Sequence, residues 1–193
     1  MTTANKITIV RILLIPFFVT EMIYYTRTGD DMHRLIGLIC FAVAAISDGI
    51  DGYIARRYNQ RSELGAFLDP MADKLLLVSG IVVLSFDNGS HLDRIPLWVT
   101  ATIISRDLLL LFGAAVIHYT VGAVNVRPRF VGKLATVLQM IMVFWGLLKW
   151  DAIWFNRLCV ATAIVAVVAW AFYVWDGMRQ LSMSPKSFPS AKQ

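Results

Sequence analysis

Long apolar runs separated by short polar segments dominate the pattern of this chain. The polar separators carry turn residues, as in TRTGDD at 26–31, DNGS at 87–90 and RPR at 127–129. A bilayer core about 30 Å thick is crossed by about 20 apolar residues of helix. Six runs reach or approach that length, at 7–25, 35–54, 64–86, 95–119, 134–148 and 158–175. The pattern therefore predicts an all-α integral membrane protein with six transmembrane helices.

Composition agrees with a membrane protein that forms a single domain. Of the 193 residues, 58% are hydrophobic and only 16% are charged, a balance that a water-soluble domain does not show. Six Trp and six Tyr suit the two membrane–water interfaces. We expect one membrane-embedded domain over 1–180. The Ser-, Pro- and Lys-rich segment 181–193 is expected to be a disordered cytoplasmic tail.

The distribution of Lys and Arg predicts the orientation in the membrane. Ten of these residues fall on the side that holds both termini and five on the other side. Because cytoplasmic loops carry the excess of positive charge, both termini are expected in the cytoplasm, with a bacterial inner membrane as the setting. The net charge of +5 is not arranged as a basic stripe with interleaved aromatic residues, which argues against nucleic acid. An anionic lipid surface is the better partner for it.

A charged stretch, SDGIDGYIARRYNQRSELGAFLDPMADK at 47–74, interrupts the apolar pattern between the second and third runs. Asp48 and Asp51 are three residues apart and Asp69 and Asp73 are four apart, so each pair shares a helical face. The two helices run antiparallel, because only a short loop joins them. Their acidic faces can therefore meet, and the sequence predicts four carboxylates in a small volume at the cytoplasmic membrane border.

Four carboxylates cannot all stay ionised at close range without a counter-charge. Either some of them hold protons or divalent cations lie among them. Oxygen ligands suit hard ions such as Mg²⁺ or Mn²⁺. Small residues surround the acids and leave room for a ligand near the backbone, although close helix–helix packing would favour the same residues. These are Gly49, Gly52, Ala55, Gly65 and Ala66.

The order and spacing of these residues resemble the signature of the CDP-alcohol phosphotransferase family. The matching pattern is Asp48-x2-Asp51-Gly52-x2-Ala55-Arg56-x8-Gly65-x3-Asp69-x3-Asp73, and six apolar spans suit the family over nearly the whole chain. The resemblance implies transfer of a phosphatidyl or similar group from a CDP-linked lipid to an alcohol, with release of CMP.

The family's functional positions carry over residue by residue. The resemblance implies that the metal ligands, for two cations, are Asp48, Asp51, Asp69 and Asp73. Asp73 is also the implied general base on the acceptor hydroxyl. The residues implied for binding the CDP-lipid are Gly52, Ala55, Arg56 and Gly65. The resemblance also implies a homodimer.

Other cations suggest an anionic acceptor. Thr8 and Arg11 lie on one helical face in NKITIVR, a segment that resembles the start of phosphatidylglycerophosphate synthases, although Arg11 could instead snorkel to headgroups. Arg106 lies in the middle of the fourth run, where we expect it either to bind the acceptor phosphate or to pair with an acid on another helix. The further candidates for acceptor binding are Arg127, Arg129 and Lys133, which could equally serve as cytoplasmic anchors.

Two acceptors and one other class of protein stay open at this point. Glycerol-3-phosphate is the first choice. The segments ISRDLLLL and RPRFVGKLATVLQ resemble cardiolipin synthases of the same superfamily, which implies phosphatidylglycerol as the alternative. An ion-coupled transporter is the distant alternative, because carboxylates within a membrane also bind transported ions.

Overall fold

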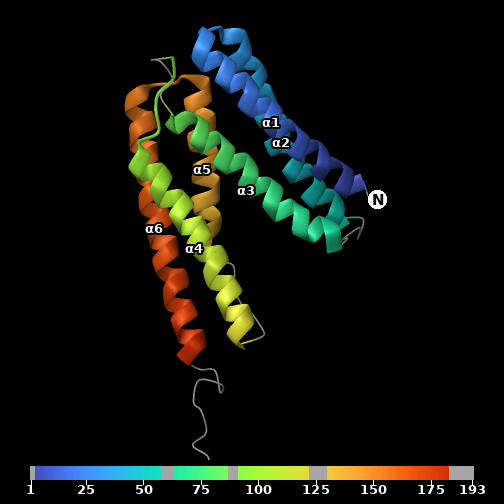
Figure 1. Cartoon of the computed structure of the whole chain (residues 1–193), viewed down its shortest axis with the longest axis vertical. Helices are drawn as coiled ribbons and strands as arrows, with labels where there is room; N and C mark the ends of the chain where they lie inside the picture. The colour runs from blue at the N-terminus through green and yellow to red at the C-terminus, as the bar shows by residue number, and fades with distance from the viewer. Residues whose placement is uncertain (1–2, 58–62, 87–90, 122–129, 183–193) are drawn as a thin grey trace, which may run out of the picture. The chain divides into compact units, whose positions relative to one another are not determined.

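The computed structural model describes the backbone of residues 3–57, 63–86, 91–121 and 130–182. Side chains are described in these ranges except at 3–6, 49–57, 63–67, 70, 114–121, 177 and 179–182. Helices account for almost all of the described chain, and no strand occurs in it (Figure 1). They are α1 (Thr3–Thr28), α2 (Asp31–Arg57), α3 (Glu63–Ser85), α4 (Leu97–Val121), α5 (Phe130–Leu148) and α6 (Ala152–Ser182). The all-α class and the six expected helices are therefore confirmed.

Within the described residues, three segments are long and apolar enough to cross a membrane. They lie in α1, α5 and α6, at Ile7–Thr28, Phe130–Leu148 and Ala152–Asp176. Helices α2 and α3 carry more charge: the described side chains of each include three Asp, Lys or Arg, which are costly in hydrocarbon. Six spans with both termini in the cytoplasm thus remain a prediction.

Large apolar side chains cover much of the surface of the helices. Leu13, Phe17, Leu108 and Phe112 are between 60% and 71% exposed. Water would solvate such a surface poorly, since burying one such side chain is worth roughly 1.5–3 kcal/mol. Lipid chains are the natural environment for these helix faces.

Two compact units make up the chain. One consists of Met1–Ile95 with Met140–Asn156, and the other of Pro96–Gln139 with Arg157–Gln193. The first unit contains α1, α2, α3 and the second half of α5. The second unit contains α4, the first half of α5 and most of α6, and within it the ring of Tyr173 lies directly against Gly132. The single domain expected over 1–180 remains a prediction.

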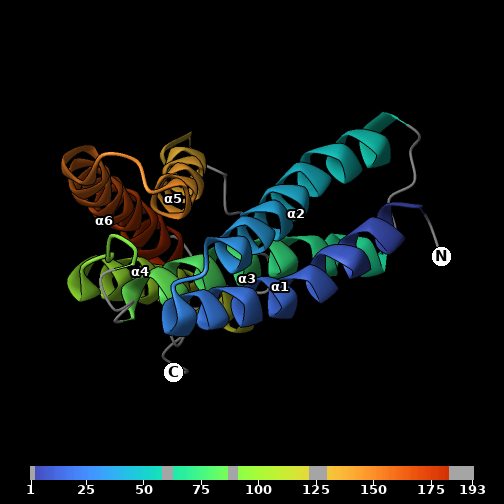
Figure 2. The same ribbon diagram turned by 90° about the horizontal axis from the view of Figure 1, so that it is seen from above.

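Helix α1 packs along both α2 and α3 in the first unit (Figures 1 and 2). Phe18 of α1 and Phe41 of α2 are buried with their ring centroids 5.3 Å apart, and Phe41 lies 5.0 Å from Phe144 of α5. Gly80 brings α3 close to α5, because a Cβ atom there would lie 2.7 Å from Cγ1 of Val143. The core of this unit therefore fixes α1 against the two helices that carry the acids.

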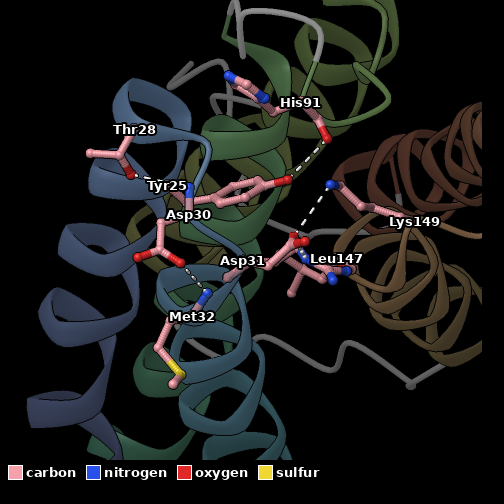
Figure 3. A network of polar contacts seen from close by, with 9 residues as sticks. Tyr25, Thr28, Asp30, Asp31, Met32, His91, Leu147 and Lys149 are labelled. Atoms are coloured by element: carbon pink, nitrogen blue, oxygen red, sulfur yellow. Dashed lines mark hydrogen bonds and ion pairs between the residues drawn. The ribbon is translucent and has the colours of Figure 1, made fainter.

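Polar contacts join three chain connections at one end of the first unit (Figure 3). The Tyr25 hydroxyl donates to the His91 carbonyl oxygen at 3.1 Å, and Nζ of Lys149 lies 3.4 Å from Oδ1 of Asp31. Lys149 follows α5 with a φ of 55°, a conformation that favours glycine. Asp48 lies 17 residues after Asp31 in α2, about 25 Å along the helix. The acids are thus at the other end of α2.

Candidate active site

Two buried polar side chains of α1 point at the acids of α2 and α3. Thr8 and Arg11 lie three residues apart, so they occupy neighbouring positions on one face of α1. Both are fully buried. This face packs against α2 and α3, which is why a short stretch of α1 can reach acids from two different helices.

The contacts of these two side chains define the site. The Thr8 hydroxyl donates to Oδ1 of Asp69 at 2.6 Å. Nη1 of Arg11 donates to Oδ1 of Asp48 at 3.0 Å and to Oδ1 of Asp73 at 2.8 Å. The structure therefore brings Asp48 of α2 together with Asp73 of α3, and holds Asp69 on the same face of α1.

Arg11 supplies a counter-charge that the sequence did not lead us to expect. From the sequence, protons or divalent cations were the two ways to balance the acids. Here a guanidinium that is fully buried pairs with two carboxylates whose side chains are 39% exposed. Arg11 does not snorkel to headgroups, and in this arrangement it contacts the acids. A role for Thr8 or Arg11 in binding the acceptor remains a prediction.

The other residues of the signature lie outside the described side chains. Asp51, Gly52, Ala55 and Arg56 belong to the helical backbone of α2, and Gly65 belongs to that of α3. Asp51 follows Asp48 by three residues in an unbroken helix, so the backbone keeps the two acids on one face.

The donor set of the site fits a hard divalent cation. Carboxylate oxygens from two helices approach the same turn of α1, and Mg²⁺ and Mn²⁺ prefer such ligands. Among the described side chains, however, no three Asp, Glu, His or Cys residues surround a common point as metal ligands. Arg11 lies between two of the acids instead.

The cations expected to bind the acceptor belong to other parts of the chain. Arg106 and Lys133 lie in the second unit, so the structure does not relate them to the aspartates. Arg127 and Arg129 lie outside the described residues. Nη1 of Arg106 donates to Oδ1 of Asp107 at 2.7 Å, and both side chains are largely buried. Among the described side chains, the acid that pairs with Arg106 is therefore its neighbour in α4.

Gln139 is a buried polar residue that the sequence analysis did not single out. It lies in the middle of α5 and is 2% exposed. Its amide nitrogen, like Nε of Arg106, has no hydrogen-bond partner among the residues that the structure describes. A glutamine within an otherwise apolar run was the available signal.

Comparison with known proteins identifies the family of this chain. Residues 1–175 match the model of the CDP-alcohol phosphatidyltransferase family. A CDP-diacylglycerol–glycerol-3-phosphate 3-phosphatidyltransferase of Salmonella paratyphi A is 32% identical over 179 residues, 91% of each chain. A Shigella flexneri protein of the same description has the same identity and coverage.

A mycobacterial protein adds a second description. A probable phosphatidylglycerophosphate synthase of Mycobacterium tuberculosis is 35% identical over 144 residues, which are 72% of this chain and 63% of that protein. The family match spans α1, α2 and α3, where Thr8, Arg11 and the aspartates lie, and it identifies a transferase family and not a transporter. The family match, with which the geometry of the acids agrees, shows that this chain belongs to the CDP-alcohol phosphatidyltransferase family.

Proposed function

We propose that this protein is a phosphatidylglycerophosphate synthase. It transfers the phosphatidyl group of CDP-diacylglycerol to glycerol-3-phosphate and releases CMP. The convergence of Asp48, Asp69 and Asp73 on one turn of α1 is the observation that carries the proposal. The descriptions of the relatives support the choice of substrates.

The four aspartates would hold the divalent cations, two Mg²⁺ or Mn²⁺ ions in our proposal. Their ligands would be Asp48, Asp51, Asp69 and Asp73, all carboxylates of the kind that hard cations prefer. Bound cations would supply neutralisation of the pyrophosphate charge and of the charge on the departing CMP.

Asp73 would act as the general base. Its carboxylate accepts the proton of the acceptor hydroxyl, and that oxygen then forms a bond to the phosphorus of the phosphatidyl group. The bond from this phosphorus to the CMP oxygen breaks, so CMP leaves with both bonding electrons. Because a carboxylate is a weak base, much of the rate would come from holding the hydroxyl next to the phosphorus.

Substrate binding would fall to residues on either side of the acids. Gly52, Ala55 and Gly65 leave space for the cytidine, and Arg56 binds the pyrophosphate, in line with the family signature. For the phosphate of the acceptor we propose Arg106, Arg127, Arg129 and Lys133. Arg106 contacts Asp107 through Nη1, which partly neutralises its charge. Its Nε can then donate to a ligand.

Membrane placement and assembly complete the proposal. Six spans, with both termini and the active site on the cytoplasmic side of a bacterial inner membrane, agree with the excess of Lys and Arg on that side. A homodimer is proposed on the likeness to the family alone.

A comparison of acceptors tests the proposed function. Purified protein in detergent micelles is given CDP-diacylglycerol and Mn²⁺, and CMP release is measured with glycerol-3-phosphate, phosphatidylglycerol, serine or inositol. We expect release with glycerol-3-phosphate and its loss on adding a chelator. Release with phosphatidylglycerol alone would instead identify a cardiolipin synthase, and release that is insensitive to the chelator would refute the metal site.

A further inference from the structure

We infer that Arg11 is a positioning residue that keeps the carboxylate site assembled while no divalent cation is bound, and that a bound cation replaces it as the counter-charge. This inference rests on the proposed function, because it takes the aspartates as the metal ligands. It assigns to Arg11 a role other than acceptor binding.

Arg11 lies between the carboxylates that a divalent cation would bind. A single nitrogen, Nη1, lies within 3.0 Å of one oxygen from α2 and one from α3. Arg11 itself comes from a third helix, and its side chain is fully buried and therefore shielded from water. Without it, Asp48 and Asp73 would face each other as like charges in a site that is only partly open to water.

A divalent cation cannot share these two oxygens with Arg11 at little cost. A cation held by Asp48 and Asp73 would bring a second positive charge to the two carboxylates that Arg11 already contacts. The two positive groups would repel each other more strongly in this partly buried site than in bulk water. Cation binding therefore weakens the Arg11 contacts, and Arg11 in turn lowers the affinity for the cation.

Thr8 allows the exchange without loss of the site. Its hydroxyl holds Asp69 on the same face of α1 independently of Arg11. When Arg11 yields Asp48 and Asp73 to a cation, α1 stays attached to α3 through this hydrogen bond. The acids then change partners while the helices keep their places.

A purely structural ion pair would behave differently, and this difference is measurable. Loss of a structural pair lowers stability equally with and without metal. Loss of a counter-charge that a cation can replace lowers stability only when no cation is present. A cation that binds the folded variant more tightly also stabilises it more, which offsets the loss. The response of stability to Mn²⁺ therefore separates the two roles.

The experiment compares the full-length wild type, Arg11→Gln and Arg34→Gln in detergent, each after chelator treatment and again with Mn²⁺. Arg34 is a matched control, since it pairs with Asp31 and donates to the Leu147 carbonyl away from the acids. We expect Arg11→Gln to lower the metal-free unfolding temperature by about 10 °C. Mn²⁺ should restore most of that loss and should bind Arg11→Gln about tenfold more tightly than the wild type. Arg34→Gln should keep the wild-type Mn²⁺ shift.

A second variant covers the case in which Arg11→Gln does not fold without metal. Arg11→Gln combined with Asp48→Asn removes one negative charge along with the positive one, so its metal-free unfolding temperature should recover. Failure to recover, or an equal Mn²⁺ shift in the wild type and Arg11→Gln, would overturn the inference. So would the absence of any Mn²⁺ shift in the wild type. A wild type that binds Mn²⁺ but forms no CMP would refute the proposed function alone.

Discussion

The hydroxyl of Thr8 donates a 2.6 Å hydrogen bond to Oδ1 of Asp69, a residue 61 positions further along the chain. Thr8 is fully buried on α1, and Asp69 lies near the start of α3. Together with the contacts of Arg11, this bond makes one turn of α1 the support for acids from two other helices.

Removing the Thr8 hydroxyl should therefore weaken both the fold and the reaction. A hydrogen bond to a charged group contributes about 1.5–3 kcal/mol, so Thr8→Val should lower kcat/KM roughly tenfold and lower the unfolding temperature. Thr8→Ser keeps the hydroxyl and should behave much like the wild type. CMP release and thermal unfolding in detergent measure the two effects. Equal losses in the Val and Ser variants would show that the hydroxyl is not the cause.

Replacing the proposed base should remove activity while the protein stays folded. In Asp73→Asn the side-chain carbonyl oxygen can still accept from Arg11, but the amide takes up no proton from the acceptor. Loss of general-base catalysis costs about 10²–10⁴ in rate, so we expect kcat to fall by that factor with little change in unfolding temperature. Asp31→Asn, at an exposed acid far along α2, is the control and should keep its activity. A comparable loss in both variants would contradict a specific role for Asp73.

The sequence predicted features of this site that lie within one helix, but not contacts between residues far apart in the chain. The length of each apolar run predicted the six helices, and helical periodicity predicted that Asp48 and Asp51, like Asp69 and Asp73, share a face. Periodicity does not state which helix packs against that face. Arg11 is 37 residues from Asp48 and 62 residues from Asp73, so its contact with them depends on tertiary packing alone.

Local pairing was also hard to predict for a long side chain. Arg106 and Asp107 leave a helix about 100° apart, so the sequence did not predict that they would pair. The flexible stem of an arginine can nevertheless return its guanidinium to a neighbour, and Nη1 of Arg106 lies 2.7 Å from Asp107. Backbone spacing therefore limits short side chains more strictly than long ones.

Close packing of α3 against α5 should make Gly80 intolerant of a side chain. A Cβ atom at Gly80 would lie 2.7 Å from Cγ1 of Val143 and 3.2 Å from Cε2 of Phe41, and the short branched valine cannot move far. We expect Gly80→Ala to destabilise the protein by about 1–3 kcal/mol. Gly113→Ala in α4 is the matched control, since no described residue lies within 4 Å of its Cβ position, and it should stabilise by about 0.5–1 kcal/mol. Thermal unfolding of the two variants distinguishes them by the sign of the change.

The contacts of Lys149 should make stability depend on pH in the alkaline range. Hydrogen bonding to the Tyr25 side chain, supported by the charge of Asp31, raises the pKa of Lys149 above its ordinary value of 10.5. A raised pKa in the folded protein contributes stability that is complete below 10.5 and is lost as the pH rises through the folded value. The difference in unfolding temperature between the wild type and Lys149→Met should therefore be constant below pH 10 and shrink above it.

A second substitution separates the contribution of the Lys149 ammonium group to stability from that of the backbone conformation at this position. With a φ of 55°, Lys149 adopts a conformation that costs other residues about 1–2 kcal/mol relative to glycine. Lys149→Gly and Lys149→Met both lack the ammonium, so the Gly variant should be the more stable by that amount. The difference in stability between these two variants should be the same at every pH. A difference that changed with pH would contradict the separation into ammonium and backbone contributions.

The buried amide of Gln139 should reduce the stability of the protein. Its nitrogen has no hydrogen-bond partner within the described part of the chain, and leaving such a donor unpaired costs about 1–3 kcal/mol. Gln139→Met keeps the length and removes the donor, so we expect the unfolding temperature to rise by about 2–4 °C per kcal/mol regained. Thr162→Val, at a buried hydroxyl that donates to the Leu158 carbonyl, should bring no such rise. A lower unfolding temperature for Gln139→Met would mean that the amide is paired in the folded protein.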